Sequence, residues 1–142
     1  MKKVSIIYWS NGGNVEVLAN IIAEKLEEND TLINLKQVGI ADLNDVLEAD
    51  AIAFGSPSMD NNRIEQNEME PFIKQLEELE INKKLLLFGT YGWGQCEFIN
   101  EWEKRMKSCG FDVIGKLAIG EAPSDEQIEE LKDLSKNLIN LE

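Results

Sequence analysis

The sequence predicts an α/β fold in which helices cover both faces of a parallel β-sheet. Apolar runs of strand length alternate with segments of helical periodicity, and this alternation occurs five times without a long polar tract between the units. The chain has 142 residues, of which 43% are hydrophobic, which is the size and composition of one ordinary domain with a core. We therefore expect a single α/β domain over residues 1–142, with right-handed crossovers.

The first half of the chain contains three predicted strands. The first, Val4–Tyr8, precedes a helix whose apolar residues recur at three- and four-residue spacing: Val15, Leu18, Ala19, Ile22, Ala23 and Leu26. The second, Thr31–Lys36, alternates apolar and polar residues, as is typical of a sheet edge. A short helix is expected around Leu43–Leu47. The third strand, Ala51–Gly55, is continuously apolar, which indicates burial on both faces.

The second half repeats the pattern with two more strands, Lys84–Gly89 and Asp112–Ile119. Two helices are expected before and between them, with apolar faces made by Phe72, Ile73, Leu76 and Leu79, and by Phe98, Ile99, Trp102 and Met106. Pro71 suits a first helical turn and Gly110 a helix stop. The last helix opens with Ser124 and Gln127 at the spacing of a capping box.

Three predicted loops should lie together, because ligands of such sheets bind beyond the carboxyl ends of the strands. The loops after strands one, three and four read YWSNGGNV, GSPSMDNN and TYGWGQC. Each alone is adequately explained as a turn, since turns favour glycine and asparagine. Together they place four large side chains on loops at one edge, which favours a ligand site: Trp9, Met59, Tyr91 and Trp93.

The segment Ser10–Val15 offers consecutive backbone N–H groups at a helix N-terminus, which suits one phosphate group. The triphosphate motif GxxxxGK and the dinucleotide motif GxGxxG are both absent. Trp93, between Gly92 and Gly94, could stack on a flat aromatic ligand, and the Met59 thioether could face its other side. Alternatively, Trp93 is a core aromatic and Met59 fills a gap in packing.

Composition excludes several function classes. The chain has no histidine, and its two cysteines, Cys96 and Cys109, form no CxxC pair, so zinc sites built on histidine or clustered thiols and histidine-activated nucleophiles are excluded. The net charge of −13 disfavours nucleic acid and anionic membranes and favours a basic protein partner, although solubility explains it equally well. The N-terminal apolar run is too short to span a membrane and lacks a signal-peptide cleavage site, so we expect a cytoplasmic protein.

The segments IIYWSNGGN, AIAFGSPSM, EPFI (Glu70–Ile73), LFGTYGWG and EWEKRM make the chain resemble the short-chain flavodoxins over essentially its full length. These are small FMN-binding electron carriers of bacteria. The resemblance implies a flavodoxin-like three-layer α/β/α fold with a five-stranded parallel sheet of order 2-1-3-4-5. It also implies a monomer that holds one non-covalent FMN and, rather than acting as an enzyme, carries electrons at low potential between redox proteins with basic docking surfaces.

The resemblance further assigns cofactor-binding residues to three groups. The FMN phosphate would be cradled by Ser10, Asn11, Gly12, Gly13, Asn14 and Val15. The loop along the inner face and N5 edge of the flavin would comprise Pro57, Ser58, Met59, Asp60, Asn61 and Asn62. The outer stacking group and the backbone donors to the pyrimidine end would come from Thr90, Tyr91, Gly92, Trp93 and Gly94.

The sequence departs from the family pattern at three places. Gly12 and Val15 replace residues that usually carry hydroxyls, so FMN should bind about a hundredfold or more weakly than is normal for the family. Asp60 replaces the glycine whose peptide flips when the flavin is reduced, which makes that flip less favourable. Asn62 replaces an acidic residue near the flavin N3–H and can accept that bond without a charge.

The departures leave open an alternative, a flavodoxin-like binding or regulatory module with weak or lost FMN binding. A phosphoacceptor receiver domain is rejected, because strands three and five lack the required terminal aspartate and lysine. A flavin-dependent quinone reductase is disfavoured because the chain has no extra segment for a second substrate pocket. Acidic residues near the predicted flavin edge could steer a basic partner or simply be solvated: Glu65, Glu68, Glu70, Glu97 and Glu101.

Overall fold

The computed structural model describes residues 2–59, 62–92 and 96–140. The elements in this part of the chain alternate as predicted. They are β1 (Lys2–Tyr8), α1 (Asn14–Glu27), β2 (Thr31–Gln37), the 3-10 turn η1 (Val38–Ile40), α2 (Leu43–Leu47), β3 (Ala51–Pro57), α3 (Met69–Glu77), β4 (Lys84–Thr90), α4 (Glu97–Ser108), β5 (Asp112–Ile119) and α5 (Asp125–Ile139).

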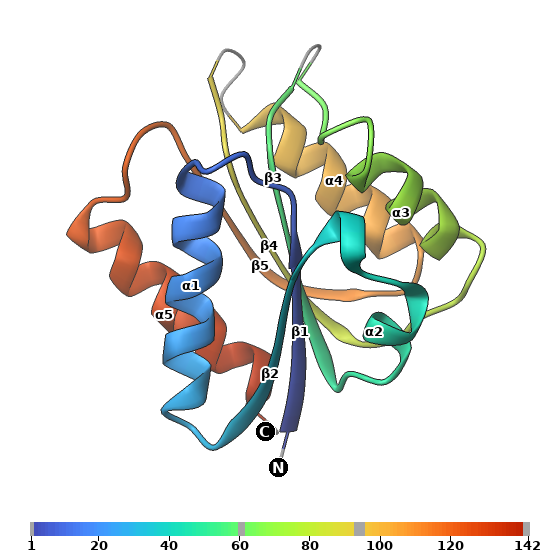
Figure 1. The fold of residues 1–142 in the computed structure, drawn as a ribbon, viewed down its shortest axis with the longest axis horizontal. Coiled ribbons are helices and arrows are strands. Elements are labelled where there is room, and N and C mark those ends of the chain that lie inside the picture. Colours follow the sequence, from blue (N-terminus) through green and yellow to red (C-terminus); the bar gives the residue numbers. More distant parts are fainter. Residues whose placement is uncertain (1, 60–61, 93–95, 141–142) are drawn as a thin grey trace.

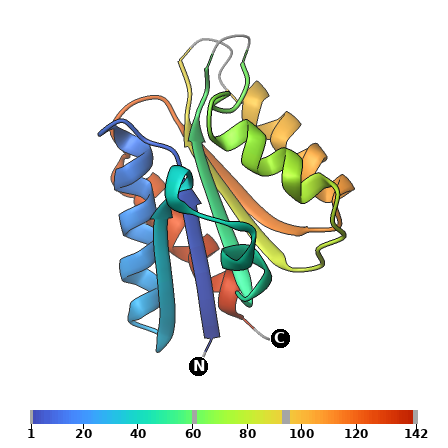
Figure 2. The same cartoon turned by 45° about the vertical axis from the view of Figure 1, so that its right-hand side comes forward.

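The five strands form one parallel sheet of order β2-β1-β3-β4-β5, which confirms the expected topology. Helices α1 and α5 cover one face, and α2, α3 and α4 cover the other (Figure 1). The chain leaves β1 toward one face and β3 toward the other, so the strand order reverses between these two strands, and sheets of this kind bind ligands beyond the carboxyl ends at such a point. Both termini lie at the opposite end of the molecule from the loops that follow β1, β3 and β4 (Figures 1 and 2).

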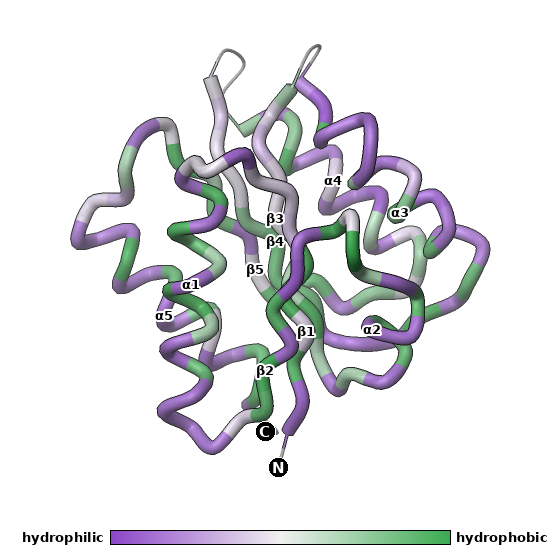
Figure 3. The backbone as a smooth tube through the Cα atoms, in the orientation of Figure 1, coloured by the Kyte–Doolittle hydropathy of each residue, from purple (hydrophilic) through white to green (hydrophobic). Residues whose placement is uncertain are grey.

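Two apolar clusters hold the layers together, one on each face of the sheet. Successive residues of a strand point to opposite faces, so Ile6 packs under α1 and α5 while Ile7 packs under α3 and α4. In the second cluster, Phe54 is the aromatic centre: its ring stacks on Trp102 at 6.3 Å and meets the edge of Phe72 at 6.2 Å. Figure 3 shows hydrophobic and hydrophilic residues alternating along α1 and α5, as expected for helices with one face on a sheet.

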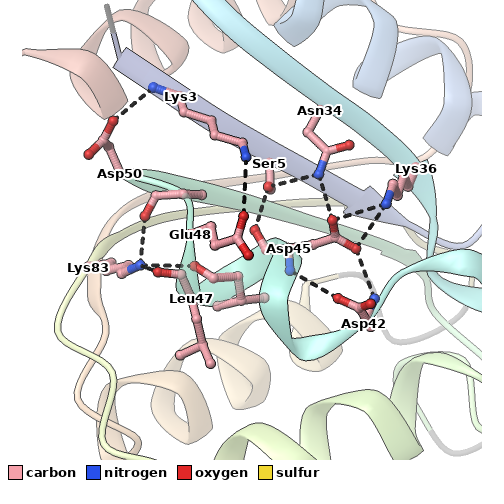
Figure 4. Close-up of polar contacts among 12 residues, drawn as sticks. Lys3, Ser5, Asn34, Lys36, Asp42, Asp45, Leu47, Glu48, Asp50 and Lys83 are labelled. Atoms are coloured by element: carbon pink, nitrogen blue, oxygen red, sulfur yellow. Dashed lines mark hydrogen bonds and ion pairs between the residues drawn. The ribbon is translucent and has the colours of Figure 1, made fainter.

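A polar network fastens α2 to the edge of the sheet (Figure 4). The Asp45 carboxylate accepts hydrogen bonds from the side chains of Asn34 at 2.8 Å and Lys36 at 3.0 Å, both on β2. The hydroxyl of Ser5, fully buried on β1, donates to the Asp45 carbonyl at 2.6 Å. Burial raises the pKa of Asp45, but hydrogen bonds from the Asp42 backbone, Lys36 and Asn34 outweigh it, so this pKa lies below its usual value. Asp45 therefore joins α2 to β2 through its carboxylate and to β1 through its backbone carbonyl.

A cation closes the other end of α2. The Lys83 ammonium, just before β4, donates to the carbonyls of Val46 at 3.0 Å and Ala49 at 2.7 Å, and also to that of Leu47 (Figure 4). Carbonyls at a helix C-terminus have no partner within the helix and carry partial negative charge, so a cation there is stabilising. Lys83 thus caps a helix that is only five residues long.

Most element boundaries agree with the sequence-based expectations. Ser124 and Gln127 form the predicted capping box of α5, and Gly110 follows α4 with the positive φ of a helix stop. Four strands are longer than predicted: β1 begins at Lys2 and β2 ends at Gln37. At the carboxyl edge, β3 continues to Pro57 and β4 to Thr90, and these two residues are paired in register. Pro57 and Thr90, predicted to lie in loops, are therefore the last residues of neighbouring strands.

Candidate ligand site at the carboxyl edge of the sheet

The three loops predicted to form a site begin side by side. Hydrogen bonding between strands continues past their ends: Trp9 N–H donates to the Gly55 carbonyl at 3.0 Å, and Ser58 N–H donates to that of Thr90 at 2.7 Å. Tyr91 N–H donates in the same way to the Ile119 carbonyl at 2.9 Å. Each loop therefore starts from a rigid base, and all three project from the same edge (Figure 2).

The loop after β1 leaves a row of backbone donors without partners. Within the described part of the chain, no hydrogen bond is made by the amides of Asn11, Gly12, Asn14 and Val15. Gly12 has φ +78°, and a Cβ built on Gly12 or Gly13 would have no atom within 4 Å. Successive free N–H groups at a helix N-terminus, beneath open space, are suited to an oxyanion that approaches the backbone closely.

Side chains in this loop stabilise the backbone. The Ser10 hydroxyl accepts a hydrogen bond from Gly13 N–H at 3.1 Å, and its own proton stays available for an acceptor. The Val15 side chain is 3% exposed and packs in the core beneath α1, so only its backbone amide can face a ligand. Of the two positions that lack hydroxyls, Val15 is thus part of the core and Gly12 serves the turn.

The loop after β3 forms a tight turn around Met59. Met59 N–H donates to the Arg63 carbonyl at 2.7 Å, and Asn62 N–H donates to the Met59 carbonyl at 3.0 Å. Asn62 lies in the left-handed region with φ +56°. The Met59 side chain is 40% exposed, as expected of a residue that contacts a ligand rather than the core. Asp60 and Asn61, also predicted to bind the cofactor, lie outside the described residues.

The loop after β4 is linked to the loop after β3. The Asn62 side-chain amide donates to the Glu97 carboxylate, at the start of α4, at 3.1 Å. Because its nitrogen is engaged there, the Asn62 amide oxygen remains available as an acceptor. Tyr91 is half-buried and Gly92 is exposed, with free space above its backbone. The predicted stacking residue Trp93 and its neighbour Gly94 lie outside the described residues.

A buried carboxylate anchors the loop after β3, and the sequence analysis did not identify this role. Glu65 is 1% exposed, and its carboxylate accepts hydrogen bonds of 2.8 Å from the backbone N–H groups of Asn67, Glu68 and Met69 at the start of α3. Its own N–H donates to the Ser56 hydroxyl at 2.9 Å. Its spacing from the helix start was the available signal, since acidic residues are favoured at helix N-termini.

The structure corrects the set of acidic residues proposed to steer a partner. Glu65 is buried, and Glu70 forms a bidentate ion pair with Arg105 of α4, which also binds Glu77. Through these hydrogen bonds Arg105 holds the pKa of Glu77 below its usual value. Three members of the set are exposed: Glu68, Glu97 and Glu101. Glu68 accepts a hydrogen bond from the Trp9 indole at 3.0 Å.

A hollow of about 350 Å³ adjoins the site between the loop after β3 and α4. It is lined by Asn62, Arg63, Ile64, Glu70, Phe98, Glu101, Trp102 and Arg105. The Trp102 indole nitrogen is buried and has no hydrogen-bond partner among the described residues. The ion pairs of Arg105 with Glu70 and Glu77 stiffen one wall of this hollow.

The two cysteines lie in different environments. Cys96 is exposed and immediately precedes α4, whereas Cys109 is buried at the other end of the same helix. Burial raises the pKa of the Cys109 thiol, with a further contribution from the charge of Glu77. The described residues contain no cluster of three acidic, cysteine or histidine side chains arranged to hold a metal, and none of their helices could cross a membrane.

Comparison with known proteins identifies the family. A family model described as Flavodoxin matches residues 6–133. The chain belongs to the flavodoxin family. A flavodoxin from Clostridium beijerinckii is 30% identical over 97% of this chain and all of the relative, and one from Megasphaera elsdenii is 33% identical over 94% and 96%. The solution structure of two-electron reduced Megasphaera elsdenii flavodoxin has a TM-score of 0.85 and 32% identity, covering 94% of this chain and 98% of that one.

The family and the fold predicted from the sequence are thereby confirmed, as is an electron carrier of the flavodoxin type, and no comparison favours the alternative of a binding module. Family membership implies a flavin cofactor. The loop after β1 fits the phosphate of a flavin cofactor. It carries four unpartnered amides and the Ser10 hydroxyl, and the space above Gly12 and Gly13 is open.

Proposed function

We propose that this flavodoxin binds FMN non-covalently and carries electrons on it between redox proteins of the cytoplasm, without acting as an enzyme itself. The observation that carries the choice of FMN is the set of unpartnered amides of Asn11, Gly12, Asn14 and Val15. These donors suit a phosphate, and riboflavin has no phosphate. A carrier role is supported by the two flavodoxins at 30% and 33% identity, whose whole or nearly whole length this chain matches.

The chain would divide the work of binding among its three loops. The amides of Asn11, Gly12, Asn14 and Val15 and the hydroxyl of Ser10 would hold the phosphate. Met59 would lie against one face of the ring, with the Asn62 amide oxygen available to a ring N–H, and Trp93 would cover the other face. When bound, FMN supplies the capacity to take up and release electrons one at a time. The loops bind it, orient it and exclude water.

The charge of the molecule would influence both the cofactor and the partner. The net charge of −13 disfavours added negative charge on a bound flavin ring and so lowers the reduction potential of the flavin. The exposed carboxylates of Glu68, Glu97 and Glu101 lie near the start of α3 and α4, beside the loops. These groups would attract a donor or acceptor with a basic docking surface. Glu65 and Glu70 would take no part, because they are engaged within the protein.

Titration of the purified apoprotein with FMN, followed by quenching of flavin fluorescence, tests the proposal. We expect saturable quenching at one FMN per chain. The loaded protein should then be reduced by a basic flavoprotein reductase at a rate that falls as salt is added. Absence of saturable quenching would overturn the FMN proposal in favour of a binding module. A rate independent of salt would remove electrostatic steering while leaving the cofactor in place.

A further inference from the structure

The loop proposed to bind the phosphate, Ser10–Val15 (the phosphate loop), is contacted by a residue of β2. Gln37, the last residue of the edge strand β2, makes two hydrogen bonds to the backbone of Ser10. Ser10 N–H donates to Gln37 Oε1 at 3.1 Å, and Gln37 Nε2 donates to the Ser10 carbonyl at 3.0 Å. Only one orientation of the amide satisfies both bonds, since a carbonyl must face a donor and an NH2 group an acceptor.

These two bonds determine which way the next peptide group faces. The described peptide bonds are trans, and a trans peptide holds its C=O and its N–H antiparallel. With the Ser10 carbonyl turned toward Gln37, the N–H of Asn11 must point away from β2. That N–H is the first of the four unpartnered donors. The Ser10 N–H, by contrast, is occupied by Gln37 and cannot serve a ligand.

The same contact supports the rest of the loop. Gln37 holds both the N–H and the carbonyl of Ser10. The Ser10 hydroxyl then accepts a hydrogen bond of 3.1 Å from the N–H of Gly13, which precedes the first residue of α1. Gly12 and Gly13 give this segment more backbone freedom than other residues would, so the loop loses more entropy when it is ordered around an anion. A restraint already present in the protein reduces that loss at the moment of binding.

We infer that Gln37 is a positioning residue for phosphate binding: its side-chain amide holds the Ser10 peptide so that the donors of Asn11–Val15 face the phosphate of the cofactor. This inference rests on the proposed binding of FMN. It explains how a loop without hydroxyls at positions 12 and 15 retains an ordered set of donors. Gln37 would act through the Ser10 backbone and not by a contact of its own with the phosphate.

The test compares two ligands that differ only in the phosphate. Dissociation constants of FMN and riboflavin are measured by flavin fluorescence for the wild type, Gln37→Leu and Asn34→Leu. The wild type should bind FMN about a hundredfold or more tightly than riboflavin, because several charge-assisted hydrogen bonds reach the phosphate. In Gln37→Leu the FMN dissociation constant should rise roughly 10- to 100-fold, while that of riboflavin changes less than about threefold.

Asn34→Leu is the matched control, because Asn34 is also an amide on β2 but binds Asp45 rather than the loop. The ratio of FMN affinity to riboflavin affinity in Asn34→Leu should equal that of the wild type. An unchanged ratio in Gln37→Leu, or equal weakening of both ligands, would overturn the inference while the proposed function stands. If the wild type binds FMN no better than riboflavin, the inference also fails; if it binds neither, the proposed function fails with it.

A second variant supplies a readout that simple destabilisation would not produce. In Gln37→Glu at pH 8, one carboxylate oxygen faces the Ser10 carbonyl and repels it, so the preference for FMN should fall as in Gln37→Leu. At pH 4, below the ordinary glutamate pKa of about 4.3, a protonated carboxyl can donate to the Ser10 carbonyl and accept from its N–H, as the amide does. Relative to wild type at the same pH, the preference should recover in Gln37→Glu and not in Gln37→Leu. If the preference for FMN over riboflavin changes with pH in the same way in both variants, the inference is contradicted. If Gln37→Leu does not fold, the pH dependence of Gln37→Glu relative to the wild type is the test.

Discussion

At the scale of single residues, the phosphate loop shows why the usual hydroxyls are missing here. Gly12 adopts φ +78°, a conformation that costs other residues roughly 1–2 kcal/mol. Threonine, branched at Cβ, suits this conformation poorly. Val15 packs in the core, where a threonine would bury a hydroxyl. Restoring the family's hydroxyls would therefore disturb the turn and the core on which the free amides depend.

We predict that Gly12→Ala lowers the free energy of unfolding by about 1 kcal/mol or more, because alanine must adopt a positive φ. The matched control is Gly13→Ala, where the backbone is extended at φ −101° and ψ −161° and the added Cβ meets nothing within 4 Å. Gly13→Ala should be neutral or slightly stabilising. Urea unfolding of the apoprotein measures both, and equal effects would mean that conformation at position 12 is unimportant.

Glu65 provides the second prediction at this scale. Glu65→Ala leaves three N–H groups at the start of α3 without their buried acceptor, so the protein should lose about 2–4 kcal/mol of stability. Glu78→Ala, an exposed carboxylate at the other end of α3, should cost less than about 0.5 kcal/mol. Similar losses in the two variants, measured by urea unfolding, would contradict the anchoring role of Glu65.

Gln37 and Glu65 also mark the limit of prediction from sequence at this scale. The candidate loops could be found because glycine, asparagine and exposed aromatic residues have local preferences that a sequence displays. Gln37 is 27 residues from Ser10, and Glu65 is nine from Ser56, so their roles depend on the register between strands and on the path of a loop. No local pattern distinguishes either residue from the many polar residues of a surface.

At the scale of elements, local chemistry determined most boundaries. The capping box at Ser124 and the stop at Gly110 occur as predicted, because both depend on residues within one turn of the helix end. The strands β3 and β4 exceeded their predicted ends because Pro57 and Thr90 pair with each other, which neither segment reveals alone. The order of strands came from the resemblance to a family, since periodicity identifies strands without ordering them.

The Asp45 network gives a prediction for the short helix α2. The pKa of Asp45 is lower in the folded protein than in the unfolded chain, so its stabilising contribution is present above about pH 4 and is lost as the pH falls through the folded pKa. Asp45→Asn should therefore lower stability at pH 7 by about 1–2 kcal/mol. Between pH 5 and pH 3, its stability should fall less steeply than that of the wild type.

The control for Asp45 lies at the end of the same helix. Glu48 forms an exposed ion pair with Lys3 at 3.8 Å, and Glu48→Gln should change stability by less than about 0.5 kcal/mol at pH 7. Urea unfolding at several pH values measures both variants. An Asp45→Asn protein with the same acid dependence as the wild type would show that this carboxylate does not link α2 to the sheet.

At the scale of the whole molecule, the net charge of −13 should oppose folding through self-repulsion. We predict that the melting temperature of the apoprotein rises by about 3 °C or more between 10 mM and 300 mM NaCl, since salt screens exposed charges and affects the partly buried pairs of Arg105 less. Calorimetry or circular dichroism measures this, and a flat or falling melting temperature would show that ion pairs outweigh the repulsion.

A charge variant separates this effect from the general action of salt on proteins. Glu27, Glu80 and Glu130 are exposed and form no ion pair within the described residues. With all three replaced by lysine, the protein should melt at a higher temperature in low salt and respond less to added NaCl. An unchanged response would assign the stabilisation to salt effects on hydration rather than to charge.

The contrast between the two thiols gives the molecule a practical property. Cys96 is open to solvent at the start of α4, next to the loop that follows β4, while Cys109 is buried and its pKa is raised. Under mild conditions a maleimide reagent should attach to Cys96 alone, because the thiolate is the reactive form and Cys109 is both shielded and protonated. The protein thus has a natural attachment point for one fluorophore or electrode linker at the edge where its cofactor and partners would meet.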